Sequence, residues 1–255
     1  MKPLKVGIIG LGTVASGVVS VLSKNRDEIK RRLGTTIEIE MVYVRSLERE
    51  NPFNLNLTTN IDDILHNDEI EMVIELIGGI HPAFEYIKSA LINKKGVITA
   101  NKELIALHGN ELMQIAAEND TPLRFEAAVA GGIPILKTLR EGLAANRISS
   151  VAGIINGTSN YILTEMTEKG SSFDECLKEA QALGYAEQDP TFDIKGIDAA
   201  HKLTILASIA FGIPLSFEQL TIEGIDQLSA EDIALAKEYG YTIKHLGIAK
   251  REEDG

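Results

Sequence analysis

A lysine and several carboxylates stand close together in the second half of the sequence. Lys202 follows Asp198 by four residues, within the largely apolar run Ile197–Phe211, whose pattern is typical of a helix. Residues four apart share one face of a helix, so these two side chains can pair. Three more carboxylates precede them: Glu187, Asp189 and Asp193. Such a cluster could hold an ammonium group while Lys202 serves a reacting carbonyl as general acid. An ordinary helix pair beside a solvated loop is the alternative.

A short turn near the N-terminus has the composition of a dinucleotide phosphate site. It follows the apolar run Lys5–Ile9, which predicts a buried strand, and precedes apolar residues at helical spacing. Gly10 permits a tight turn, Gly12 leaves space for a pyrophosphate, and a helix N-terminus stabilises phosphate charge. A merely tight strand-to-helix turn is the alternative. The candidate cofactor-binding residues here are Gly10, Leu11, Gly12, Thr13 and Val14, followed by the small Ala15.

The end of the second predicted strand, Ile37–Val44, bears on the identity of the dinucleotide. An acidic residue at this place normally binds the ribose 2′-hydroxyl of NAD. The chain instead reads Val44-Arg45-Ser46, and an arginine can neutralise the 2′-phosphate of NADP. The sequence therefore favours NADP over NAD, with a solvated arginine at the start of a loop as the alternative.

Strands and helices alternate along the first half of the chain. This order predicts a Rossmann-type doubly wound parallel sheet, an α/β fold whose ligand lies at the carboxyl ends of the strands. After the first two strands, we expect strands at Met72–Ile77, Gly96–Ala100 and Leu123–Ala127, with helices at Ala83–Asn93 and from Asn101-Lys102 onward.

Three residues at predicted strand ends belong beside the glycine turn. They are Gly78, Ala100 and Lys102. Lys102 could position a carbonyl oxygen or a carboxylate near a nicotinamide. A surface lysine at the start of a helix is the alternative, although its charge opposes the helix dipole there.

The pattern changes near residue 132, so we expect two domains. The first, 1–131, is the predicted dinucleotide-binding domain, and the second, 132–255, is a predicted α+β domain for substrate binding and dimerisation. In the second we expect helices at Ile135–Leu143, Gly157–Lys169, Phe173–Leu183, Ile197–Phe211 and Ser229–Tyr239, and strands at Val151–Asn156 and Tyr241–Ala249.

Composition narrows the class of protein. The chain has 255 residues, 44% of them hydrophobic, which excludes disorder along its whole length. Its net charge of −12 argues against bulk nucleic-acid binding, which needs a cationic face. No apolar stretch approaches the roughly 20 residues that span a bilayer. A single cysteine, Cys176, suits a reducing cytoplasm. We expect a cytoplasmic protein that binds small molecules, with neither membrane nor nucleic acid as a partner.

Longer segments extend these motifs. They read GLGTVASGV at Gly10–Val18, TANKELIA at Thr99–Ala106, FEAAVAGGIPI at Phe125–Ile135, NGTSNYIL at Asn156–Leu163 and GYAEQDPTFDIKGIDAAHKL at Gly184–Leu203. In this order they resemble homoserine dehydrogenase, from Lys5 to about Gly212. The resemblance implies an oxidoreductase that uses NAD(P) to interconvert L-aspartate-4-semialdehyde and L-homoserine, in threonine and methionine biosynthesis.

The resemblance also implies roles for the candidate residues. Lys202 would donate a proton to the aldehyde oxygen with support from Asp198, and Lys102 would help to position substrate and nicotinamide. The substrate-binding residues would be Glu187, which binds the ammonium group, together with Gly157, Thr158, Tyr185 and Asp193. A sodium ion would bind Glu126 and the backbone of Val129, Gly131 and Ile133, although Glu126 could equally be only a hinge residue.

Family members continue beyond a strand like Tyr241–Ala249, and many add a regulatory ACT domain. The chain therefore resembles a C-terminally truncated member, and a cofactor-binding but catalytically impaired fragment, or a nucleotide-sensing module, is the alternative function. Members commonly dimerise through the second domain, so we expect a homodimer or a higher homo-oligomer.

Aspartate-semialdehyde dehydrogenase handles the same aldehyde but needs a cysteine nucleophile. Cys176 lies within a predicted amphipathic helix, which argues against that enzyme.

Overall fold

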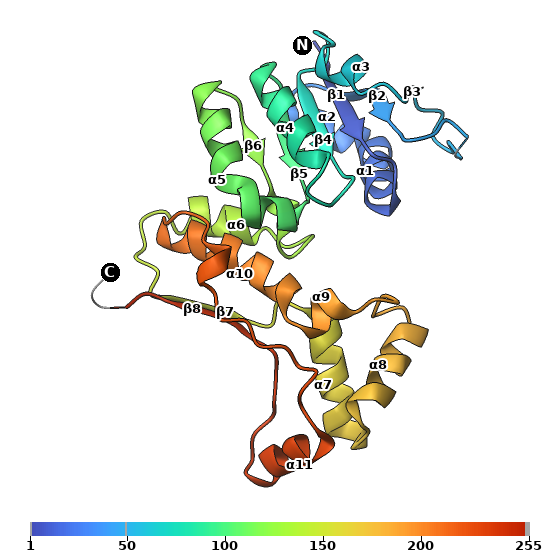
Figure 1. Ribbon diagram of the computed structural model, residues 1–255. Coiled ribbons are helices and arrows are strands. Elements are labelled where there is room, and N and C mark those ends of the chain that lie inside the picture. The colour runs from blue at the N-terminus through green and yellow to red at the C-terminus, as the bar shows by residue number, and fades with distance from the viewer. Residues whose placement is uncertain (1, 49, 253–255) are drawn as a thin grey trace. The chain divides into compact units, whose positions relative to one another are not determined.

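The computed structural model describes residues 2–48 and 50–252 (Figure 1). The contacts within the chain divide it into two compact units, 1–134 and 135–255. Among the residues described, no helix combines the length and the apolar character needed to cross a membrane.

The first unit is built on a six-stranded parallel sheet with the order β3-β2-β1-β4-β5-β6. The strand order reverses between β1 and β4, which is the place where doubly wound sheets bind ligands. Every described strand pair in it is parallel, which confirms the predicted Rossmann-type architecture. The strands are β1 Leu4–Ile9, β2 Ile37–Tyr43, β3 Leu57–Thr58, β4 Met72–Glu75, β5 Gly96–Thr99 and β6 Leu123–Arg124.

Helices connect these strands and bury their apolar faces against the sheet. Val6 and Ile8 of β1 pack with Ala15 and Val19 of the first helix, and these four side chains are almost completely buried. This packing fixes the glycine turn between strand and helix. The helices are α1 Thr13–Lys24, α2 Arg26–Leu33, α3 Asp62–Leu65, α4 Ala83–Ile92 and α5 Lys102–Glu118, followed by the 3₁₀ turn Glu126–Ala128.

Three details of the first unit differ from the sequence-based expectation. A second helix that was not predicted, α2, forms in the charged stretch after Lys24, and in it Arg31 and Arg32 both bind Glu28. The fifth predicted strand is short, since the chain turns into 3₁₀ helix at Glu126. The two-residue strand β3 was not predicted, because two residues carry no periodicity.

The second unit combines a small antiparallel sheet with helices, which confirms the predicted α+β character. Strands β7 (Ser150–Gly153) and β8 (Gly247–Lys250) pair with each other and pack against α10. Helices α7, α8 and α11 contribute to a separate apolar core around Ile162 and Met166. The helices are α6 Ile135–Lys137, α7 Gly157–Lys169, α8 Phe173–Ala182, α9 Thr191–Ile194, α10 Ile197–Phe211 and α11 Ala230–Glu238.

Three predicted elements of the second unit are clearly shorter than expected. The strand expected at Val151–Asn156 ends at Gly153. The helix expected at Ile135–Leu143 ends at Lys137 and widens into a π turn, in which the N–H of Leu143 binds the carbonyl of Thr138 at 2.9 Å. The strand expected at Tyr241–Ala249 begins only at Gly247. The backbone of His245, two residues before this strand, does not pair with another strand. It exchanges two hydrogen bonds with the side chain of Asn160.

Candidate functional site

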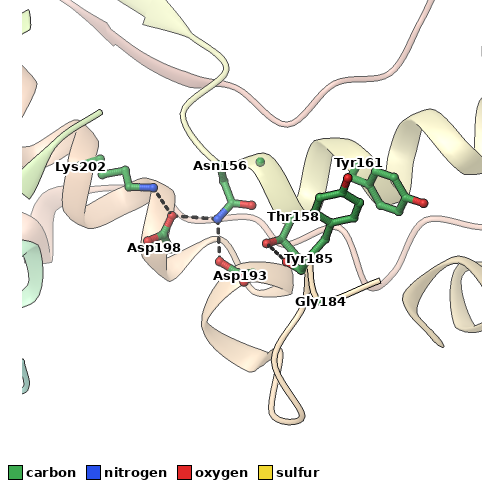
Figure 2. Close-up of a pocket in the computed structure, with 9 residues that line it drawn as sticks. Asn156, Thr158, Tyr161, Gly184, Tyr185, Asp193, Asp198 and Lys202 are labelled. Atoms are coloured by element: carbon green, nitrogen blue, oxygen red, sulfur yellow. Dashed lines mark hydrogen bonds and ion pairs between the residues drawn. The ribbon is translucent and has the colours of Figure 1, made fainter. Parts of the chain in front are cut away.

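An open pocket of about 540 Å³ lies within the second unit. Six residues singled out from the sequence line it, which places them in one cavity although they are distributed over 46 positions of the chain (157 to 202). The nine lining residues are Asn156, Gly157, Thr158, Tyr161, Gly184, Tyr185, Asp193, Asp198 and Lys202, and Figure 2 shows how they lie.

Helix α10 supplies a lysine–aspartate pair to the wall of this pocket. Lys202 Nζ lies 2.6 Å from Asp198 Oδ2, the i,i+4 contact expected from the spacing, and donates to the carbonyl of Ile155 at 2.9 Å. The Lys202 side chain is 21% exposed and that of Asp198 only 9%. Among the described residues, two partners hold this ammonium group, which has three N–H donors. The third N–H can therefore serve a ligand in the pocket.

Asn156 connects the two aspartates of the pocket, as the dashed lines in Figure 2 show. Its amide nitrogen donates to Asp193 Oδ1 at 2.7 Å and to Asp198 Oδ2 at 2.8 Å. Its amide oxygen accepts the N–H of Ser159 at 2.8 Å and so caps α7. Sequence reasoning missed this residue, although an asparagine directly before a predicted helix is a preferred cap. Its two donors reduce the repulsion between carboxylates that face one pocket.

The opposite part of the pocket carries two tyrosines. The hydroxyl of Thr158 donates to the carbonyl of Tyr185 at 2.8 Å and ties α7 to the loop that follows α8. The rings of Tyr161 and Tyr185 lie 4.8 Å apart, tilted by 42°. Burial, together with the charges of Glu165 and Glu179, raises the pKa of Tyr161. Tyr161 and Gly184 were not predicted as lining residues.

The other two carboxylates of the sequence cluster lie outside the lining of the pocket. Glu187 is exposed, two residues after Tyr185, and its carbonyl accepts a hydrogen bond from Gln181 at 3.1 Å. Asp189 binds the hydroxyl and the N–H of Thr191 at 2.6 and 3.1 Å, and these bonds lower its pKa. Asp189 therefore shapes the loop before α9, while Asp193 and Asp198 face the pocket.

The glycine turn lies in the first unit, between β1 and α1. Gly10 has a φ of +96°, and a Cβ there would lie 2.7 Å from Ile77 Cγ2, so only glycine fits. Gly12 has an extended conformation, and a Cβ there would meet no atom within 4 Å. Thr13 and Val14 are exposed, while Leu11 is buried. This open space beside a helix N-terminus fits the phosphates of a dinucleotide.

The other candidates for cofactor binding lie at neighbouring strand ends. Gly78 follows β4 with a φ of +70°, and Ala100 and Lys102 follow β5, with Lys102 as the first residue of α5. Arg45 follows β2 and is exposed. The hydrogen bond to Tyr43, together with burial, raises the pKa of Tyr86 to about 12, and the charge of Arg45 opposes that rise.

The residues named for a sodium ion lie near the end of the first unit. Glu126 begins the 3₁₀ turn, and Val129 directly follows that turn and is buried. The chain then bends at Ala130 and Gly132, which have φ values of 50° and 86°. Gly131 and Ile133 lie in this bend and are exposed.

Comparison with protein families gives two matches. Residues 10–126 match a family described as "Homoserine dehydrogenase, NAD binding domain". Residues 134–253 match the family "Homoserine dehydrogenase". The two matches cover the glycine turn and the pocket respectively.

Curated proteins and solved structures give the same family. The chain is 56% identical to a homoserine dehydrogenase of Pseudomonas aeruginosa over its whole length and spans 59% of that relative. It is 46% identical to that of Bacillus subtilis, with 99% of this chain and 59% of the relative covered. The crystal structure of a homoserine dehydrogenase from Thiobacillus denitrificans superposes with a TM-score of 0.97 at 57% identity, over the whole of this chain and 59% of that one. The chain belongs to the homoserine dehydrogenase family.

Proposed function

We propose that this chain catalyses the NAD(P)-dependent interconversion of L-aspartate-4-semialdehyde and L-homoserine. The observation that carries the proposal is the ammonium group of Lys202, held by Asp198 and the Ile155 carbonyl in the wall of an open pocket. Family membership supports the same reaction. A nicotinamide, when bound, supplies the hydride for the reduction.

The proposed role of Lys202 is to move a proton at the substrate oxygen. Reduction of an aldehyde builds negative charge on that oxygen, and a nearby ammonium both stabilises the charge and delivers the proton. In the reverse direction, the neutral amine of Lys202 takes the proton from the substrate hydroxyl. Asp198 holds Lys202 in place, and Asn156 in turn holds Asp198. This arrangement favours a catalytic chain over one that only binds or senses a nucleotide.

The proposed substrate contacts follow the pocket lining. Glu187 would bind the substrate ammonium from the adjoining loop, and the pocket would be completed by Gly157, Thr158, Tyr185 and Asp193. In this proposal residues 132–255 bind substrate, and residues 1–131 bind the cofactor. Lys102 would position the nicotinamide.

Binding of L-homoserine tests the substrate proposal. In calorimetric titrations of the chain with NADP⁺ bound, we expect L-homoserine to bind and 4-hydroxybutyrate, which lacks the ammonium group, to bind at least about tenfold more weakly. Glu187→Gln should weaken homoserine binding by a similar factor, while Asp189→Asn, which keeps the oxygen that accepts from Thr191 on the same loop, should not. Equal binding of both compounds to the unaltered chain would contradict the pocket's proposed selectivity.

The proposed cofactor is NADP, with NAD as the second choice. The open space at Gly12 and the exposed start of α1 support a dinucleotide at this turn. Arg45, at the end of β2, supports NADP because a guanidinium can bind the 2′-phosphate.

Replacement of Arg45 by alanine tests this preference. We expect the affinity for NADPH to fall about tenfold and that for NADH to stay nearly unchanged, because only NADPH carries the 2′-phosphate. Fluorescence titration with each nucleotide measures both constants. Equal losses for NADPH and NADH would show that Arg45 does not distinguish them.

Three further parts of the proposal come from the family resemblance. A sodium ion would be held by Glu126 and backbone carbonyls of the following bend. The chain would form a homodimer or a higher homo-oligomer. It would act in the cytoplasm.

A further inference from the structure

A carboxyl group held by backbone N–H and hydroxyl donors, that of Glu75, is buried at the end of β4. The Glu75 side chain is 0% exposed. Its Oε1 accepts the N–H groups of Ile77 and Gly78 at 2.7 and 3.2 Å, and its Oε2 accepts the hydroxyl of Thr99 at 2.6 Å. Within the described part of the chain Glu75 forms no ion pair. A buried carboxyl group is costly unless its oxygens accept hydrogen bonds, and the three donors that satisfy Glu75 come from two separate segments of the chain.

The partners of Glu75 lead to Asn101, the N-cap of α5, which directly precedes Lys102. The Thr99 hydroxyl accepts the N–H of Asn101 at 3.0 Å. The Asn101 oxygen caps α5 by accepting the N–H of Leu104 at 3.1 Å, and its amide donates to the carbonyl of Gly79 at 2.6 Å. Hydrogen bonds therefore form a closed ring. Glu75 binds the loop after β4, this loop binds Asn101, Asn101 binds Thr99, and Thr99 binds Glu75.

This ring joins two segments that are distant in sequence. The loop Leu76–Gly79 bends back at Gly78 and Gly79, both with a φ of 70°, and two of its N–H groups turn inward to Glu75. Neighbouring strands β4 and β5 align Glu75 with Thr99. An apolar side chain at Glu75 would leave the inward N–H groups without an acceptor.

We propose that Glu75 is a positioning residue for Lys102. Through the ring it holds the loop Leu76–Gly79 and the start of α5 as one rigid edge, on which the nicotinamide end of the cofactor rests. The inference depends on the proposed function, because Lys102 and Gly78 are cofactor contacts only there.

The experiment replaces Thr99, the link between Glu75 and Asn101, with valine. Thr99→Ser keeps the hydroxyl. Thr58→Val is a matched control, because Thr58 makes the same pair of bonds elsewhere in this unit, to Asp63 Oδ2 at 2.5 Å and to the N–H of Asn60 at 3.0 Å. For each variant, fluorescence titration gives the affinity for NADPH, and homoserine-dependent reduction of NADP⁺ gives kcat. Thermal melting confirms folding.

We expect Thr99→Val, which removes both hydrogen bonds of the Thr99 hydroxyl, to lower the affinity for NADPH about fivefold and kcat about tenfold. Thr99→Ser should restore both values, and Thr58→Val should change neither. In a Lys102→Ala background, Thr99→Val should lower kcat by less than about twofold, because its effect on kcat acts through Lys102. A purely structural role would lower kcat equally in both backgrounds.

Three results would overturn the inference, and the third is distinguishable from the first two. If the unaltered chain binds NADPH and turns over while Thr99→Val matches it, the ring does not position Lys102. The same holds if Thr58→Val reproduces the losses. If the unaltered chain does not bind NADPH, the proposed function is wrong and the inference fails with it.

Discussion

Replacing Lys202 with alanine will lower kcat for homoserine-dependent reduction of NADP⁺ by about 100-fold or more, while NADPH still binds. The loss has a geometric reason. Nζ is the donor that Asp198 and the Ile155 carbonyl hold in the pocket wall, and alanine removes it without touching the glycine turn of the other unit. Steady-state kinetics and fluorescence titration of NADPH measure the two quantities.

One further variant separates proton transfer from charge, and a second serves as a control. Lys202→Arg keeps a positive charge, but a guanidinium does not release its proton at ordinary pH, so this variant should be nearly as slow as Lys202→Ala. Lys195→Ala is the matched control, because Lys195 also pairs with an aspartate, Asp226, at 2.7 Å, outside the pocket lining. Turnover close to that of the unaltered chain in Lys202→Ala would remove Lys202 from the mechanism.

Replacing Gly12 with alanine will lower the affinity for NADPH about 100-fold without lowering the melting temperature of the free chain. Gly12 has an extended conformation that alanine can adopt, and its Cβ would meet no protein atom within 4 Å. The new methyl group would instead occupy the space assigned to the pyrophosphate. Fluorescence titration and thermal melting test the two halves of this expectation.

Gly17 provides the matched control for this substitution. It lies within α1, and a Cβ there also meets no atom within 4 Å. Gly17→Ala should keep the affinity for NADPH and raise stability by up to about 1 kcal/mol, since alanine is the better helix former. An unchanged affinity in Gly12→Ala would contradict a phosphate site at this turn.

Much of the fold could be predicted because its elements have regular apolar patterns. The run Lys5–Ile9 and the helical spacing after Val14 predict β1 and α1, and the strand-to-helix alternation predicts the parallel sheet. Elements without periodicity were missed or misjudged. The strand β3 has only two residues, and the segment before Gly247 is apolar in places but is held by Asn160 rather than by a strand.

The candidate site was predictable where chemistry follows local spacing. Lys202 and Asp198 are four apart on one helix, so their contact could be foreseen. The contact of Asn156 with two aspartates depends on how α7, α9 and α10 pack, which no local pattern records. The ring around Glu75 depends on the register of β4 with β5 and was missed for the same reason.

The measurement that tests the central claim most directly is homoserine-dependent reduction of NADP⁺ and NAD⁺ by this chain of 255 residues at alkaline pH. The account predicts turnover that requires L-homoserine and is faster with NADP⁺. No turnover with either nucleotide, in a folded chain that binds NADPH by fluorescence, would contradict it and identify a cofactor-binding chain that does not perform the reaction.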